Sequence, residues 1–184
     1  MYKRQGDEHA DEQGHGAEDP HFWTDPLAMR DVVIALATAL VEAGIDTGDD
    51  AEAMAAALER LDAEVAGILA SVPPDRRKLV TGHRSMGYFA DRYGFELIGT
   101  VIPGLSTAGE PSARELAALI EAIRANDVPA VFSEVGTPQS VARAVSGDSG
   151  AELVELSTSQ LPEEGGYAGF ILDLAHAVAD ALGD

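Results

Sequence analysis

Two histidines stand in short segments whose composition suits the presentation of a side chain rather than the filling of a core. His21 lies in Asp-Pro-His-Phe-Trp-Thr-Asp-Pro at residues 19–26, and His83 lies in Leu-Val-Thr-Gly-His-Arg-Ser-Met-Gly-Tyr-Phe at residues 79–89. Neutral imidazole is the commonest protein ligand for transition-metal ions. The two histidines therefore predict a transition-metal site to which both contribute.

The elements that must position these side chains follow from hydrophobic periodicity. Apolar residues recur every three or four positions from Pro26 until Gly44, and again over residues 51–69, which predicts two helices. After Pro74 the expected order is strand 78–82, helix 85–93, strand 96–102, helix 112–125, strand 130–133, helix 138–145, strand 152–156 and helix 167–182. This alternation predicts the α/β class, with a mostly parallel four-stranded sheet flanked by helices.

A carboxylate, Glu134, directly follows the predicted strand at residues 130–133, just as His83 follows the strand at 78–82. In parallel sheets, binding groups gather in the loops at the carboxyl ends of the strands. These two strands can be neighbours, so Glu134 and His83 can share one rim of the sheet. Glu134 is therefore the candidate third metal ligand, beside His21 and His83.

The chain also divides by composition. Residues 1–18 hold histidines, acids and glycines without large aliphatic side chains, which predicts a flexible tail or loop that captures metal only loosely. Residues 51–74 read as a long helix ended by two prolines, and residues 75–184 as a complete α/β lobe. Residues 19–50 look like a piece of another unit.

The charge balance restricts the partners. The 184 residues include 12 Lys and Arg against 32 Asp and Glu, a formal net charge of −20. This charge argues against nucleic acid and against an anionic membrane surface, and it favours cations. The absence of cysteine excludes thiolate metal sites. No apolar run is long enough to cross a bilayer, and the start of the chain lacks a secretory signal, so we expect no membrane insertion of this chain.

Two other classes of function stay open at this point. The order Gly82, His83, Ser85, Gly87 resembles a nucleophile elbow, but its spacing is wrong, because two residues rather than one separate Gly82 from Ser85. One alternative is nevertheless a small α/β metal-dependent hydrolase, whose site would lie at the rim of the sheet where His83 stands. The other is a metal-free α/β interaction domain, in which the histidines are packed polar residues and His176 is merely solvated.

The two histidine segments resemble those of the zinc/manganese-type substrate-binding proteins of ABC importers. Residues 19–26 match that family's Asp-Pro-His segment, and residues 83–94 match a segment with Gly-Tyr-Phe and Tyr-Gly. The resemblance extends over roughly residues 7–184 and includes Ala130–Glu134 as a strand of the second lobe. It implies a two-lobed fold joined by a long helix, with metal bound in the cleft by His21 and His83. It also implies a permease partner and a periplasmic or cell-surface location.

The same resemblance shows departures from the family. Residues 19–50 correspond to only a remnant of the N-terminal lobe, and the histidine that this lobe normally contributes is missing. The family's acidic ligand falls at residues 157–160, where Ser-Thr-Ser-Gln stands, so Glu134, Glu163 or Glu164 would have to substitute. We therefore expect a fragment with an incomplete ligand set. Two imidazoles and one carboxylate suit Zn²⁺ better than Mn²⁺, and a closed binding site implies no catalysis.

Overall fold

The computed structural model describes residues 19–104, 110–134 and 136–183, so the predicted tail at residues 1–18 lies outside the described residues. The expected helices and strands are present, with small shifts at their ends. In chain order they are η1 (Phe22–Thr24), α1 (Pro26–Glu42), α2 (Asp50–Leu69), η2 (Pro74–Arg76), β1 (Lys78–Thr81), α3 (Gly87–Tyr93), β2 (Glu96–Thr100), α4 (Ala113–Ala125), β3 (Ala130–Glu134), α5 (Gln139–Ser149), β4 (Glu152–Leu156) and α6 (Gly166–Leu182).

The four strands form one sheet in the order β2-β1-β3-β4, and every pairing in it is parallel. The predicted fold class is therefore confirmed. The central strands β1 and β3 are neighbours, with Thr81 opposite Phe132. Because parallel strands end at the same edge, the turn after β1 and the last residue of β3 meet at one rim of the sheet.

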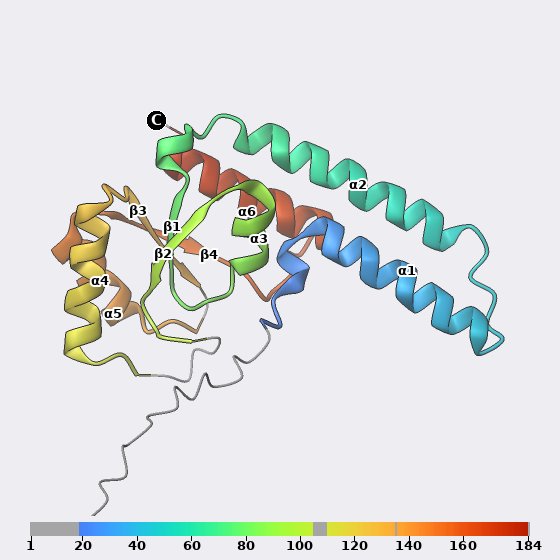
Figure 1. The fold of residues 1–184 in the computed structure, drawn as a ribbon, viewed down its shortest axis with the longest axis horizontal. Helices are drawn as coiled ribbons and strands as arrows, with labels where there is room; N and C mark the ends of the chain where they lie inside the picture. The colour runs from blue at the N-terminus through green and yellow to red at the C-terminus, as the bar shows by residue number, and fades with distance from the viewer. Residues whose placement is uncertain (1–18, 105–109, 135, 184) are drawn as a thin grey trace, which may run out of the picture.

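Helices cover both faces of the sheet (Figure 1). Helices α2, α3 and α6 pack on one face, while α4 and α5 cover the other. Side chains of β3 alternate between these two layers, with Phe132 on the first face and Val131 on the second. Glu134 lies two residues after Phe132, so its side chain is on the same face of the sheet. This carboxylate therefore lies at the end of a row of core side chains. A buried acid of this kind needs hydrogen-bond partners.

Local sequence sets the ends of several helices. Ser112 and Glu115 form the expected capping box at α4: Ser112 Oγ accepts from the Glu115 amide at 3.3 Å, and Glu115 Oε2 accepts from the Ser112 amide at 2.7 Å. Helix α3 begins at Gly87, two residues later than the predicted start at Ser85. The reason is local, because the Ser85 amide donates to the carbonyl of His83 at 2.8 Å and so belongs to a tight turn.

Helices α1 and α2 form a hairpin that projects from the sheet (Figure 1). The second half of α2 is buried against α6, whereas Pro26 is the only buried residue of α1. On the expected apolar face of α1, Leu36 is 57% exposed. None of the described helices combines the length and apolarity needed to span a membrane. The division into a tail, a lobe remnant, a linking helix and a lobe stays a prediction.

Candidate metal centre

His21 lies at the start of η1, in a turn that neighbouring groups fix in place. The hydroxyl of Thr24 donates to the carbonyl of His21 at 3.0 Å. The indole Nε1 of Trp23 donates to the carbonyl of Thr158 at 2.7 Å, and the hydroxyl of Tyr167 donates to the carbonyl of Trp23 at 3.0 Å. These bonds tie the His21 segment to the loop after β4 and to the first turn of α6.

His83 follows β1 with only Gly82 between them, at the carboxyl end of a central strand. Its carbonyl accepts two hydrogen bonds, from the hydroxyl of Thr81 at 2.6 Å and from the amide of Ser85 at 2.8 Å. The next amide, of Arg84, donates to the carbonyl of Gly104 at 2.9 Å. The backbone on both sides of His83 is therefore fixed, which leaves the imidazole with little freedom except rotation.

The structure brings the two predicted histidines together. Nε2 of His21 lies 3.3 Å from Nε2 of His83, and the ring centroids are 5.1 Å apart with an interplanar angle of 72°. Each histidine is only 7% exposed. Segments 62 positions apart in the chain thus meet through the same ring nitrogen of each imidazole.

A carboxylate lies beside the other nitrogen of each ring. Oδ1 of Asp19 lies 2.7 Å from Nδ1 of His21, within hydrogen-bond distance. Oε2 of Glu134 lies 3.5 Å from Nδ1 of His83, and this nitrogen has no hydrogen-bond partner among the described residues. Glu134 is therefore placed on the Nδ1 side of His83, opposite to the side that faces His21.

Glu134 is 1% exposed, and neighbouring donors hold its carboxylate. Oε1 accepts a short hydrogen bond from the hydroxyl of Ser85. Oε2 accepts from the amide of His83 at 3.2 Å and from the hydroxyl of Thr137 at 3.5 Å. The Ser85 hydroxyl therefore bonds to this carboxylate and not to a histidine, so the described site does not contain the serine–histidine pair of a nucleophile elbow.

The carboxylates near the Nδ1 atoms bear on which ring nitrogen carries the proton. An imidazole whose Nδ1 carries the proton donates that proton to the adjacent carboxylate and presents the lone pair of Nε2. Two lone pairs that face each other repel unless a cation lies between them. Two Nε2 atoms at a separation of 3.3 Å can share a proton or a metal ion.

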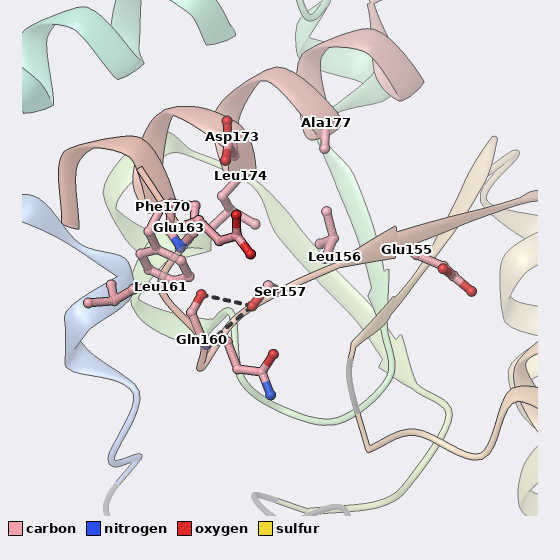
Figure 2. A pocket seen from close by; sticks show the side chains of 11 residues that line it. Glu155, Leu156, Ser157, Gln160, Leu161, Glu163, Phe170, Asp173, Leu174 and Ala177 are labelled. Carbon is pink, nitrogen blue, oxygen red and sulfur yellow. Dashed lines mark hydrogen bonds between the residues drawn. The ribbon is translucent and has the colours of Figure 1, made fainter. Parts of the chain in front are cut away.

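The other candidate residues lie elsewhere. His176 is exposed on α6, as expected. Glu163 lines a separate cavity of about 390 Å³ beside β4 and α6, together with Glu155 and Asp173 (Figure 2). Neither His21 nor His83 lines that cavity. Within the described ranges, no three His, Asp or Glu side chains are arranged as a metal-binding group.

The sequence alone does not identify three residues of the centre, Asp19, Ser85 and Thr137, in the roles that the structure gives them. Asp19 stands in the histidine segment, and its spacing of two residues from His21 is the signal that it can bind the imidazole. The sequence suggests Ser85 only as a nucleophile, although a hydroxyl two residues after a histidine can also hold a carboxylate. Thr137 gave no signal, because its contact depends on the turn after β3.

Comparison with known proteins identifies the relatives of the chain. The family model described as "Zinc-uptake complex component A periplasmic" matches residues 2–181. The zinc-binding protein TroA of Treponema pallidum is 36% identical over 124 residues, which cover 65% of this chain and 40% of TroA. The manganese-binding lipoprotein MntA of Halalkalibacterium halodurans is 28% identical over 161 residues, 85% of this chain and 53% of MntA.

Solved structures agree with this result. The Fe(III)-bound YtgA of Chlamydia trachomatis superposes with a TM-score of 0.75 at 27% identity, over 90% of this chain and 64% of that chain. The chain spans about half the length of the curated relatives that it matches. The relatives are named for zinc and manganese, and the bound metal in the superposed structure is iron.

Proposed function

The chain belongs to the family of the periplasmic zinc-uptake complex component A, whose members are binding proteins and not enzymes, and we propose that it binds Zn²⁺ between His21 and His83. The whole protein then serves as the extracytoplasmic metal-binding component of an ABC importer, and a permease is its partner. Because the chain spans about half the length of its curated relatives, we further propose that it is one part of such a binding protein.

The distance between the two Nε2 atoms carries this proposal. In a tetrahedral zinc site with Zn–N bonds of about 2.05 Å, two ligand nitrogens lie about 3.3 Å apart. The observed separation is 3.3 Å. Asp19, within hydrogen-bond distance of Nδ1 of His21, favours the tautomer of that imidazole that presents Nε2 to a metal ion, and Glu134 lies 3.5 Å from Nδ1 of His83. The metal ion is the cargo of such a protein, so tight reversible binding is the activity to measure.

Zinc is favoured over manganese by the donor set. Two imidazole nitrogens suit Zn²⁺, whereas Mn²⁺ prefers sites richer in oxygen. The histidines supply two of the four ligands of a closed zinc site. Glu134 as third ligand stays a prediction, and its position against Nδ1 of His83 supports a role in orienting that imidazole instead. Water, or a group outside the described residues, would complete the coordination.

Competition with a chromophoric chelator tests the proposal. The wild-type chain should bind Zn²⁺ more tightly than Mn²⁺, and His21→Ala or His83→Ala should abolish tight binding. His176→Ala is the matched control, because this histidine is exposed on α6. Unchanged zinc affinity in His83→Ala would remove His83 from the site and with it the proposal.

X-ray absorption on the zinc-loaded chain separates the two roles of Glu134. The wild type should show two imidazoles around the metal. If Glu134 only orients His83, Glu134→Gln lowers the affinity but keeps the number and type of coordinating atoms. If Glu134 is itself a ligand, the spectrum of Glu134→Gln changes in its nearest oxygen shell.

A further inference from the structure

Asp19 contacts both histidine segments at once. Its Oδ1 accepts from the backbone amide of His21 at 3.0 Å and lies 2.7 Å from Nδ1 of the same residue. Its Oδ2 lies against Gly87, the first residue of α3, such that a Cβ built on Gly87 would lie 2.6 Å from this oxygen. Gly87 belongs to the segment that carries His83. One carboxylate therefore spans the two segments.

Gly87 is required here for space and not for its conformation. Its φ is outside the positive range that favours glycine, so alanine can adopt this backbone without strain. A separation of 2.6 Å is shorter than Cβ atoms tolerate, so a methyl group would force the Asp19 carboxylate to move. In contrast, a Cβ at Gly67 in α2 would meet nothing within 4 Å.

We propose that Gly87 is a positioning residue of the metal centre, which acts on His21 through Asp19. The missing side chain leaves room for Asp19 to reach the start of α3 while it holds Nδ1 of His21. The segment that carries one ligand thus sets the ring orientation of the other. This inference rests on the proposed function, because it concerns the imidazole that would bind the metal ion.

A double-mutant cycle with zinc affinity as the readout tests the inference. Asp19→Ala should weaken zinc binding by about 10- to 100-fold, the usual effect of losing a carboxylate that orients a ligand histidine. Gly87→Ala should weaken binding by about 10-fold, at the lower end of that range. The double variant should bind no more weakly than Asp19→Ala alone, because the methyl group then has no carboxylate to displace. Gly67→Ala is the matched control and should bind like the wild type.

A second readout needs no metal. The ¹⁵N shifts of the His21 ring in the metal-free protein report which nitrogen carries the proton. The wild type should show the proton on Nδ1, and Gly87→Ala should show a mixture of both forms. A role of Gly87 in α3 packing alone would not change this signal. If the wild type fails to bind zinc, the proposed function is lost, while the ring shifts still test the role of Gly87.

The other possible results of these experiments either support or overturn the role of Gly87. Wild-type affinity and ring shifts in Gly87→Ala would overturn the inference. The same would follow if the cost of Gly87→Ala persisted in full in the Asp19→Ala background. If Gly87→Ala fails to fold and the double variant folds, the clash with Asp19 is shown and the inference is supported. If neither folds, the glycine serves α3 itself and the inference is wrong.

Discussion

The two imidazoles of the centre meet through the same nitrogen but are supported in different ways. The partner of His21 is Asp19, two residues away in the chain and partly exposed to solvent. The partner of His83 is Glu134, which lies 51 residues away at the end of β3 and is 1% exposed. The carboxylate contact of His21 forms within one turn of the chain, whereas that of His83 requires strand pairing.

The difference separates what a short segment can do from what requires the whole fold. The contact between Asp19 and His21 can form wherever the turn forms, because all its atoms lie in neighbouring residues. The contact between Glu134 and His83 exists only when β1 and β3 pair in the correct register. Burial also raises the electrostatic effect of Glu134, since solvent does not screen it.

The largest expected effect is the loss of either metal ligand. His21→Ala and His83→Ala should each reduce zinc affinity by more than about 100-fold, beyond the range for residues that only orient a ligand. The reductions should be similar, because both Nε2 atoms face the same point. Titration calorimetry with Zn²⁺ measures this. Markedly unequal losses would show that one histidine binds metal without the other.

The next effect distinguishes the two carboxylates. Glu134→Gln and Asp19→Asn each remove a charge and keep the shape of the side chain. We expect Glu134→Gln to weaken zinc binding more, towards about 100-fold, and Asp19→Asn less, towards about 10-fold. The reason is the deeper burial of Glu134. Equal losses by chelator competition would mean that the burial of the carboxylate has no influence.

A smaller effect concerns the attachment of the His21 side to the rest of the protein. Trp23→Phe removes the hydrogen bond from Nε1 to the carbonyl of Thr158, at a cost of about 1 kcal/mol in the free energy of unfolding. Tyr167→Phe, which removes the bond to the Trp23 carbonyl, is the matched comparison. Thermal unfolding followed by circular dichroism gives both values. No change in either variant would mean that these bonds do not hold the segment.

The smallest expected effect is a loss of folding stability at alkaline pH. Burial, and then the negative charge of Asp25, raises the pKa of Tyr167 above its ordinary value. The unfolded chain releases this proton near pH 10, while the folded protein retains it, so stability is full below about pH 10 and falls above it. Urea unfolding at pH 8 and pH 11 should show a smaller loss for Tyr167→Phe than for the wild type. Equal losses would show that Tyr167 does not contribute to this fall.

Much of the fold could be predicted from the sequence because its signals are local. The capping box at Ser112 and the apolar stripe over residues 51–69 both act within a few residues, and both elements are present. The errors fall at the ends of helices and strands. Helix α5 continues to Ser149 rather than Val145, because Gly150, with a φ of 84°, is what ends it.

The centre was less accessible to sequence reasoning. The positions of His21 and His83 followed from their segments. The sequence does not predict which nitrogen of His83 Glu134 approaches, because this depends on the rotation of a buried ring. It does not predict the role of Gly87 either, because this role depends on the volume that Asp19, from another part of the chain, occupies beside it. Such facts belong to tertiary contacts and leave no periodic signal in the sequence.

Helix α2 lies half in the core and half outside it, and this has a consequence for local opening. Leu58, Leu61, Val65 and Leu69 are buried, whereas none of residues 51–57 is buried, and this part of α2 lies beside α1 (Figure 1). The same helix should therefore show a gradient of amide hydrogen exchange, slow near Leu69 and fast near Ala51. Opening of the hairpin tip then need not disturb the two imidazoles, and the metal centre can stay intact while the far end of α2 frays.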